Sequence, residues 1–310
     1  MNNIDDLYDT LLSLNLIDNK DSKEIRKLYS LSNQIEKNYK VFKIKKHNGK
    51  LRTICEPNYD LKKIQRKILD NILIKKDISK YAKAYHKGIS LKDNAECHVN
   101  KDLILKLDIK NFFDNISFYA IYKSCFQDYP KNIGMLLTYL CTYYNVLPQG
   151  APTSAYISNL VMKAFDEKLG VWCEENNISY TRYSDDMTFS GNFNPSIVII
   201  RVRKMLRSLG LKLNDKKIAV IGKSKQQLVT GIVVNEHMQV PSNYRKKIRQ
   251  EVYYIKKYGL EEHLKRIKLD NEKEYLLNLY GRILYAISIN ECDKELEDDK
   301  KYVGKLKDDI

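Results

Sequence analysis

The spacing of apolar side chains predicts which parts of the chain are helices and which are strands. In residues 1–38 apolar positions recur at helical spacing, which predicts amphipathic helices. Residues 39–46 alternate instead, and so do residues 51–54. Asn48-Gly49 between these two runs is a strong signal for a β-hairpin, which we expect to end at Pro57.

The rest of the chain mixes both kinds of element and then becomes helical. Strands are expected at 103–109, 178–183, 187–190, 217–221, 228–234 and 238–240. Helices are expected at 61–74, 117–145, 153–175 and 195–209, the last capped by Gly210, and throughout the segment from Ser242 onward. The charged residues 298–310 are expected to fray. This order predicts an α+β body and a helical C-terminal domain, with the boundary at Pro241.

Composition excludes several protein classes. The 310 residues are 43% hydrophobic and 30% charged, enough for a packed core and for roughly two domains. No long uncharged apolar run predicts a membrane-spanning helix, and acidic residues open the chain where a signal peptide would be basic. We therefore expect a cytoplasmic protein without a membrane partner. The six cysteines form no CxxC pair, so reduced, buried thiols are expected rather than a zinc site.

The net charge of +15 is concentrated in two segments. Residues 43–76 hold eleven Lys and Arg against three acids, and residues 242–268 hold nine against three. Such runs can simply be solvated helical faces. Two separate basic segments in one protein also suggest a polyanion, such as a nucleic acid, held from two sides.

Three aspartates are the strongest candidates for chemistry. Asp185-Asp186 lies between two apolar strand segments, and Asp108 ends a third. Carboxylates in such a setting are costly unless a positive charge neutralises them. Salt bridges at strand ends would do this, and so would two Mg²⁺ ions about 4 Å apart, which could activate a 3′-hydroxyl and stabilise a leaving pyrophosphate.

Four motifs, in the expected order, resemble those of reverse transcriptases. Tyr183-Ser184-Asp185-Asp186 resembles the Y-x-D-D box, with Ser184 where bacterial enzymes usually carry Ala. The other three are Asp108-Ile109-Lys110-Asn111-Phe112-Phe113, Leu147-Pro148-Gln149-Gly150-Ala151-Pro152-Thr153-Ser154, and the fingers motif around Arg52-Thr53-Ile54, Pro57 and Leu61 to Gln65. Two more resemble motifs of the retron class: Asn94-Ala95-Glu96-Cys97-His98, as NAxxH, and Val229-Thr230-Gly231, as VTG.

The resemblance implies a right-hand polymerase of the α+β class. Its fingers and palm would consist of an antiparallel sheet packed on helices, and its thumb would be all-helical. Residues 1–107 would form the N-terminal helices and fingers, with part of the fingers returning around 115–148. Residues 108–240 would be mainly palm, and residues 241–310 a thumb and RNA-binding region.

The resemblance also assigns catalytic and nucleotide-binding roles. Asp108, Asp185 and Asp186 would be the catalytic metal ligands for two Mg²⁺ ions. The nucleotide-binding residues would be a steric gate, a glutamine under the incoming nucleotide, a glycine that allows close approach, two fingers cations and a general acid: Phe113, Gln149, Gly150, Lys45, Arg52 and Lys217 (or Lys216). Each also has a plain structural interpretation, such as a core aromatic residue, a loop amide or a solvated lysine.

RNA-binding and primer-binding roles follow in the same way. Asn94 and His98 would contact or support the RNA, or else form a structural pair at helical spacing. Val229, Thr230 and Gly231 would position the primer end, with Gly231 permitting close backbone approach. In the C-terminal segment, cations interleaved with tyrosines would follow phosphates, among them Arg245, Lys246 and Arg249.

The expected function is therefore that of an RNA-directed DNA polymerase that uses deoxynucleotides. The resemblance implies that it binds a cognate non-coding RNA and copies part of it into a branched RNA–DNA (msDNA). It also implies a role in anti-phage defence with a separate effector protein. The alternatives are another bacterial reverse transcriptase, of the group II intron or diversity-generating type, and a catalytically idle RNA-binding scaffold.

Overall fold

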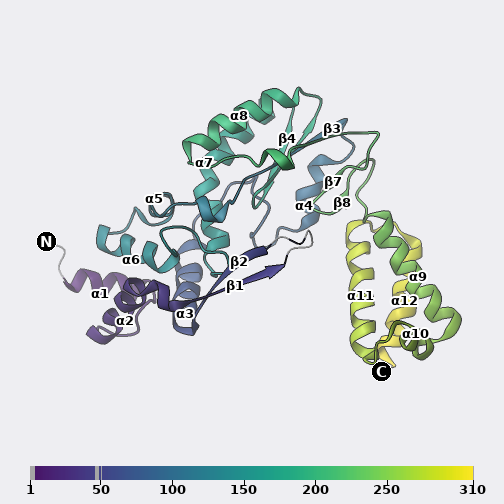
Figure 1. Cartoon of the computed structure of the whole chain (residues 1–310), viewed down its shortest axis with the longest axis horizontal. Helices are drawn as coiled ribbons and strands as arrows, with labels where there is room; N and C mark the ends of the chain where they lie inside the picture. Colours follow the sequence, from purple (N-terminus) through teal and green to yellow (C-terminus); the bar gives the residue numbers. More distant parts are fainter. Residues whose placement is uncertain (1–3, 46–48, 50, 310) are drawn as a thin grey trace. The chain divides into compact units, whose positions relative to one another are not determined.

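The computed structural model describes residues 4–45, 49 and 51–309. The chain folds into two compact units, whose elements are labelled in Figure 1. Unit 1 comprises Met1–Ile89 and Leu105–Val220, and unit 2 comprises Ser90–Ile104 and Ile221–Ile310. The C-terminal unit therefore also contains a segment from the middle of the sequence.

Unit 1 begins with the two helices that the apolar spacing predicts, α1 (Ile4–Ser13) and α2 (Ser22–Asn33). The Asp21 side chain caps α2 by accepting a hydrogen bond from Lys23 N at 2.8 Å. Leu11 and Leu28 are buried in the core of the unit. A 3₁₀ turn, η1 (Ile35–Asn38), leads into the first strand.

The predicted hairpin is confirmed. Strands β1 (Tyr39–Lys45) and β2 (Leu51–Pro57) pair antiparallel, from Tyr39 opposite Pro57 to Lys45 opposite Leu51. Its predicted turn residue Asn48 lies outside the described residues, which here include only Gly49. Val41, Ile44 and Leu51 are 47%, 43% and 56% exposed, so the outer part of the hairpin extends away from the core.

The hairpin is followed along the chain by helices. The predicted helix at 61–74 is α3 (Tyr59–Ile68), continued by the π-helical turn η2 (Leu69–Leu73). The predicted helical segment 117–145 is interrupted before Pro130 and consists of α5 (Phe118–Ile121), the π-helical turn η5 (Tyr122–Phe126) and α6 (Lys131–Cys141). The long α7 (Ser154–Glu175) contacts α8 (Pro195–Ser208). It also contacts β4 (Ser179–Tyr183), the strand that leads to the candidate site.

A four-stranded sheet carries the candidate carboxylates. Its order is β4-β5-β3-β6, with bounds β3 (Leu103–Asp108), β4 (Ser179–Tyr183), β5 (Asp186–Gly191) and β6 (Ala219–Gly222). Strands β4 and β5 are antiparallel, with Tyr183 opposite Asp186. An antiparallel hairpin packed on helices confirms the α+β class.

Unit 2 has a core of its own. It contains α4 (Leu91–Ala95), the 3₁₀ turn η3 (Glu96–His98), β7 (Leu228–Val229) and β8 (Ile232–Val233). Four helices follow, drawn green to yellow in Figure 1: α9 (Ser242–Tyr258), α10 (Leu260–Ile267), α11 (Glu272–Ile289) and α12 (Lys294–Asp308). Ile248, Leu279, Ile283 and Val303 are fully buried between them.

The predicted C-terminal fraying is wrong. Residues 298–308 belong to α12, whose Leu296 and Val303 are buried. Asp299 is only 5% exposed and forms an ion pair with Lys256 at 2.9 Å. The charges of this segment are therefore distributed around an amphipathic helix whose apolar side is anchored.

Three strand predictions also need correction. The expected strand at 228–234 is split into β7 and β8 by a turn, because Thr230 and Gly231 have positive φ values of 47° and 87°. Residues 238–240 contribute a single bridge, between Val233 and Gln239. The expected strand at 217–221 begins only at Ala219, since Asp215–Lys217 forms the 3₁₀ turn η6.

The units do not follow the predicted boundary. Pro241 is the N-cap residue of α9, but the division by contacts lies between Val220 and Ile221 and places residues 90–104 in unit 2. The division into fingers, palm and thumb stays a prediction. None of the described helices has the length and apolar character needed to cross a membrane. Four cysteines are buried as expected, while Cys97 and Cys292 are exposed.

Candidate active site

The Asp185-Asp186 pair lies at the tight turn between β4 and β5. Ser184 has a φ of 61°, a left-handed value that is uncommon for a residue with a Cβ atom. The turn is attached to the neighbouring strand, because Ile109 N donates to the Asp185 carbonyl at 3.0 Å. This bond brings the turn next to Asp108 at the end of β3.

Asp108 is held by the loop that precedes β6. Asn214 N donates to the Asp108 carbonyl at 2.8 Å, and the Asn214 side-chain amide donates to Oδ1 at 3.0 Å. Lys217 Nζ donates to the other carboxylate oxygen. The structure therefore places Lys217 and the three predicted aspartates in one charged cluster. Lys216 instead lines a pocket together with Arg203 and Arg207.

The electrostatics of this cluster favour a bound cation. Burial raises the pKa of Asp185, and the nearby charge of Asp108 raises it further. Partial burial and the charges of Asp185 and Asp108 raise the pKa of Asp186 as well, although much of its surface faces solvent. Burial opposes the charge of Lys217, but its hydrogen bond to Asp108 and the negative charges of the three aspartates together outweigh this effect and raise its pKa. A hard divalent cation would stabilise these carboxylates in their ionised form.

The donor chemistry fits such a cation, but the side chains are not yet arranged as ligands. Across residues 4–45, 49 and 51–309, no three His, Cys, Asp or Glu side chains are gathered closely enough to hold a metal ion. Lys217 occupies one oxygen of Asp108. A cation that uses this carboxylate would have to displace the lysine or share the oxygen with it.

The glutamine–glycine motif packs directly on the hairpin. Cys55 N donates to the Gln149 carbonyl at 2.8 Å, and Gln149 Nε2 donates to Asp114 Oδ1 at 3.4 Å. A Cβ atom on Gly150 would lie 2.9 Å from the Cys55 carbonyl oxygen, and the φ of Gly150 is 126°. Gly150 therefore packs directly against strand β2, and its expected close approach to a nucleotide stays a prediction.

Phe113 is half-buried. It begins the 3₁₀ turn η4 (Phe113–Asn115), five residues after Asp108, and its ring meets that of Phe112 edge-on with centroids 5.5 Å apart. Phe112 is the core aromatic, since it is only 3% exposed. Phe113 is therefore the member of the pair that can face a bound molecule.

The two cations of the hairpin, Lys45 and Arg52, do not form one cluster. Lys45 is the last residue of β1, and Arg52 pairs with Ile44 across the hairpin. Because directly paired residues share a face and successive residues alternate, Arg52 and Lys45 project from opposite faces. Both are exposed.

The NAxxH and VTG segments meet in unit 2. Asn94 is 1% exposed, and its side-chain amide donates to Thr230 Oγ1 at 3.2 Å. His98 is fully buried, and burial lowers its pKa to about 3. Val229 is fully buried as well, whereas nothing lies within 4 Å of a Cβ atom built on Gly231. Its positive φ of 87° favours glycine at this position, and the expected close approach at the primer end stays a prediction.

The basic residues of α9 differ in how they are paired. Arg245 forms ion pairs with Asp293 and Glu295, both at 2.9 Å, and Arg249 lies 3.9 Å from Glu295. Within the described residues, Lys246 has no acidic partner, so it is free to meet a phosphate.

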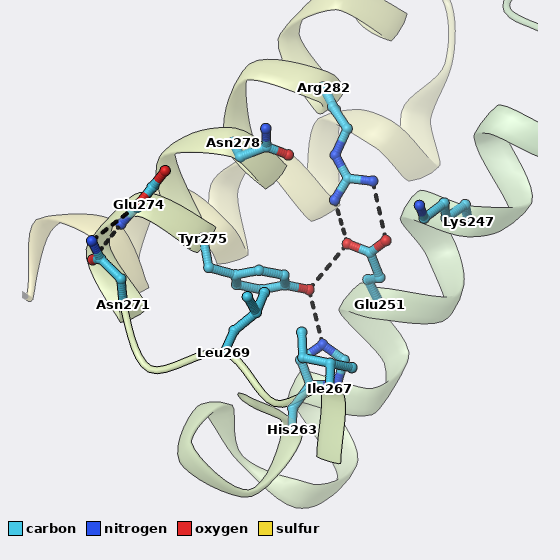
Figure 2. A pocket seen from close by; sticks show the side chains of 10 residues that line it. All are labelled: Lys247, Glu251, His263, Ile267, Leu269, Asn271, Glu274, Tyr275, Asn278 and Arg282. Atoms are coloured by element: carbon cyan, nitrogen blue, oxygen red, sulfur yellow. Dashed lines mark hydrogen bonds and ion pairs between the residues drawn. The ribbon is translucent and has the colours of Figure 1, made fainter. Parts of the chain in front are cut away.

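A cavity of about 550 Å³ lies between α9, α10 and α11 (Figure 2). A chain of polar contacts runs along one of its sides. His263 Nε2 lies 2.8 Å from the Tyr275 hydroxyl, which donates to Glu251 Oε2 at 3.0 Å. Arg282 donates to both oxygens of Glu251. Since the Tyr275 proton points to Glu251, we assign the proton of neutral His263 to Nε2.

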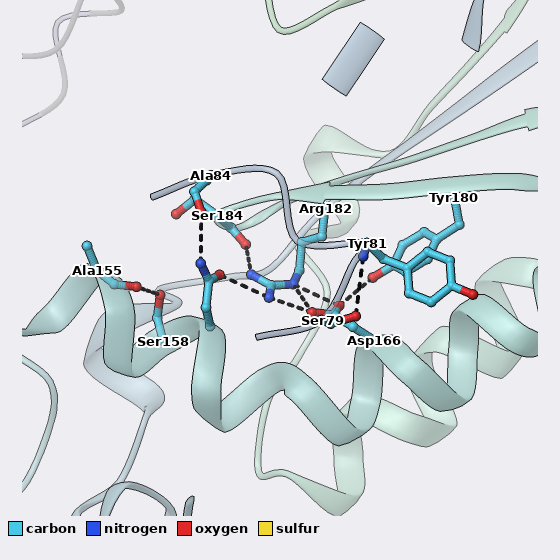
Figure 3. A network of polar contacts seen from close by, with 10 residues as sticks. Ser79, Tyr81, Ala84, Ala155, Ser158, Asp166, Tyr180, Arg182 and Ser184 are labelled. Atoms are coloured by element: carbon cyan, nitrogen blue, oxygen red, sulfur yellow. Dashed lines mark hydrogen bonds and ion pairs between the residues drawn. The ribbon is translucent and has the colours of Figure 1, made fainter. Parts of the chain in front are cut away.

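Sequence reasoning missed one group of charged residues next to the turn between β4 and β5. Arg182 and Asp166 are both fully buried and form an ion pair at 2.6 Å (Figure 3). Asp166 lies in a predicted helix and Arg182 in a predicted strand, but Asp166 is followed directly by Glu167 and Lys168, so the local sequence suggests an exposed charge. The partnership itself depends on how α7 packs against β4.

Comparisons with known proteins agree with this geometry. The sequence profile of the family "Reverse transcriptase (RNA-dependent DNA polymerase)" matches residues 44–234. The chain is 31% identical over 225 residues to the retron Ec86 reverse transcriptase of Escherichia coli, covering 70% of this chain and 70% of that protein. It is 32% identical over 256 residues to the retron Se72 reverse transcriptase of Salmonella heidelberg, covering 78% and 67%.

A solved structure of telomerase from Candida albicans with a fragment of telomeric RNA is also similar. The TM-score is 0.49 at 12% identity, covering 91% of this chain and 68% of that one. This distant similarity adds nothing to the family assignment.

The family match extends from the hairpin to the VTG segment and includes all three aspartates. The enzyme class follows from it: an RNA-directed DNA polymerase, which copies an RNA template and depends on divalent metal ions. The chain belongs to the reverse transcriptase family and, within it, to the retron reverse transcriptases.

Proposed function

We propose that this reverse transcriptase binds a cognate retron non-coding RNA and copies part of it into a branched RNA–DNA. The observation that carries the proposal is the meeting of Asp108 with the Asp185-Asp186 turn, in a chain similar to several retron enzymes. A catalytically idle scaffold would have no use for three carboxylates in this partly buried setting.

The three aspartates would hold two Mg²⁺ ions. The raised pKa values of Asp185 and Asp186 support this role, because a nearby cation relieves the electrostatic cost of ionising them. When bound, the cations would activate the primer hydroxyl and stabilise the charge on the phosphates. Lys217, released from Asp108, would supply a positive charge and a proton to the departing pyrophosphate.

The residues around the carboxylates would select and hold a deoxynucleoside triphosphate. Phe113 would exclude a 2′-hydroxyl by its bulk, and Gln149 and Gly150 would lie beneath the nucleotide. Arg52 would bind phosphate oxygens through its planar guanidinium group. Lys45 would contribute a second charge after a twist or movement of the hairpin, because the two cations leave it from opposite faces.

RNA binding would depend on unit 2 in two different ways. Lys246 and the exposed tyrosines of α9 would contact the RNA, supported by the excess of cations in residues 242–268. Asn94, His98 and Val229 are buried, which favours a supporting role beneath the RNA-binding surface. Thr230 and Gly231 would present the turn that meets the primer end. We also propose that the protein acts in anti-phage defence together with a separate effector protein.

Purification from cells that carry the native flanking DNA tests RNA binding. We expect one abundant, discrete non-coding RNA to copurify with the protein, and the purified protein to extend a generic primed RNA template with deoxynucleotides and Mg²⁺. Extension without a specific copurifying RNA would indicate another class of bacterial reverse transcriptase. A copurifying RNA without extension would support the scaffold alternative.

A further inference from the structure

Arg182 lies directly under the catalytic turn and is completely buried. It is the fourth residue of β4, two residues before the Ser184 peptide group (Figure 3). A fully buried guanidinium group is costly, and it is normally found where each of its donors has a partner. Arg182 meets this condition through bonds in two directions.

In one direction Arg182 is anchored to α7. Its Nε donates to Asp166 Oδ1 and Oδ2 at 2.9 Å and 3.1 Å, and its Nη2 donates to Asp166 Oδ2 at 2.6 Å. Tyr180 donates to Asp166 Oδ1 at 2.8 Å. Nη2 also donates to Asn159 Oδ1 at 3.2 Å, and Asn159 in turn donates to the Ala84 carbonyl at 2.8 Å.

In the other direction Arg182 holds the turn. Its Nη1 donates to the Ser184 carbonyl oxygen at 2.8 Å. That carbonyl belongs to the peptide bond that leads into Asp185. The next carbonyl, that of Asp185, accepts from Ile109 N at 3.0 Å, and the Ser184 hydroxyl meets the Tyr85 hydroxyl at 3.1 Å. The turn is thus fixed by Arg182 on one side and by the strand of Asp108 on the other.

The planar guanidinium group is well suited to this task. One edge binds the Asp166 carboxylate through two nitrogens, and the remaining nitrogen points to the turn. A lysine ammonium group is a point charge and cannot reproduce this fixed geometry. Stability alone does not explain such a pair, because apolar residues of similar volume can often replace a buried ion pair without loss of stability.

We propose that Arg182 is a positioning residue for nucleotidyl transfer. By fixing the Ser184 carbonyl, it sets the direction in which the Asp185 and Asp186 carboxylates leave the turn. Asp166 and Asn159 orient Arg182 for this purpose. The inference rests on the proposed role of Asp185 and Asp186 as metal ligands, and it adds a requirement for residues that never touch the metal or the nucleotide.

The sharpest test replaces the whole ion pair. The double variant Arg182→Met with Asp166→Leu removes both charges and keeps similar volume, so we expect it to fold with a midpoint of thermal unfolding near or above that of the wild type. We expect its kcat to fall about 10- to 100-fold, as is usual when a partner that orients metal ligands is lost. KM for deoxynucleotides should change less than about twofold, since the triphosphate-binding residues remain in place.

A second measurement does not depend on activity. Binding of Mn²⁺ to the protein without nucleotide, followed by the electron paramagnetic resonance of free Mn²⁺, should be weakened about tenfold in the double variant. Arg182→Lys should show the same losses, because its charge is retained but its geometry is not. Tyr180→Phe is the matched control: it removes one bond to Asp166, leaves the bond to the turn, and should keep both kcat and Mn²⁺ affinity.

Each outcome decides between a positioning and a structural role. A double variant that folds and keeps wild-type kcat and Mn²⁺ affinity would overturn the proposal. Should it fail to fold, Arg182→Lys decides in the same way, from activity and Mn²⁺ binding per folded molecule. Asp185→Asn tests the proposed function independently of Arg182. If Asp185 is a metal ligand, this variant should lose Mn²⁺ binding and activity whatever the role of Arg182.

Discussion

Asn94 donates a hydrogen bond from its side-chain amide to Thr230 Oγ1 at 3.2 Å, across 136 residues of sequence. The bond joins the two segments that resemble motifs of the retron class. It connects α4 to the turn between β7 and β8, whose Thr230 has a positive φ of 47°. The two motifs therefore form one structural unit.

This bond predicts an energetic coupling between the two motifs. Asn94→Ala and Thr230→Val should each lower the free energy of unfolding, and the double variant should lose less than the sum of the two. A coupling of about 1 kcal/mol is expected for a buried neutral hydrogen bond. Urea unfolding of the four proteins measures it, with Thr230→Ser as the control that keeps the hydroxyl. Strict additivity would show that the contact contributes nothing.

Phe113 should control the choice of sugar. Phe113→Ala would open space beside the carboxylates, and we expect incorporation of ribonucleotides relative to deoxynucleotides to rise about tenfold, the range for adding or removing a small group in a pocket. Single-nucleotide extension with each substrate class measures the ratio. Phe112→Leu is the control, because Phe112 belongs to the core. An unchanged ratio in Phe113→Ala would remove the steric-gate assignment.

Acid should destabilise unit 2 through its buried histidines. Burial lowers the pKa of His98 to about 3, whereas in the unfolded chain it titrates near 6.5. The unfolded state then binds the proton first, so the neutral imidazole supports folding above pH 6.5 and this support is lost as the pH falls. The loss amounts to about 2 kcal/mol between pH 7 and pH 5. Burial lowers the pKa of His263 too, which acts in the same direction.

Urea unfolding at pH 7 and pH 5 measures this effect. The difference between the two free energies of unfolding should be smaller in His98→Gln than in the wild type, because the variant has no imidazole to protonate. If both proteins respond equally to pH, the histidine is not the group responsible.

The cations of α9 should separate into those that bind RNA and those that support the fold. Lys246→Ala should reduce the slope of log affinity against log salt by about 1, as expected for one lost phosphate contact. Arg245→Ala should change the slope less and lower the thermal stability, because Arg245 is already paired with Asp293 and Glu295. Filter binding to the copurifying RNA over a range of salt concentrations measures both slopes. Equal slopes for wild type and Lys246→Ala would show that this lysine faces only solvent.

The sequence alone predicted the hairpin, the α+β class and the carboxylates of the candidate site, because each of these signals lies within a short stretch of residues. The alternation in residues 39–45 and the apolar runs around Asp185-Asp186 needed no knowledge of distant partners. Gly150 and Gly231 show the limit. Both are expected to let the backbone approach a bound nucleotide or primer, but each also has a structural reason that the sequence does not reveal: Gly150 packs against Cys55, and Gly231 has a positive φ.

The features that sequence reasoning missed depend on tertiary partners. The ion pair between Arg182 and Asp166 exists because α7 packs against β4. Helix α12 persists despite its charge because Leu296 and Val303 reach the core of unit 2, and because Lys256 neutralises the buried Asp299. In both cases, charged residues that suggest an exposed segment are neutralised by a partner on another element.

In the proposed function, the three aspartates drive the copying of a retron RNA into branched DNA. The most direct test expresses the chain with its native flanking DNA and examines total nucleic acid for a short DNA species that shifts on treatment with RNase or a debranching enzyme. We predict such a species with the wild-type protein and its loss in Asp185→Asn, at equal protein levels. A branched species that persists in Asp185→Asn would contradict the account, as would its absence from the wild type.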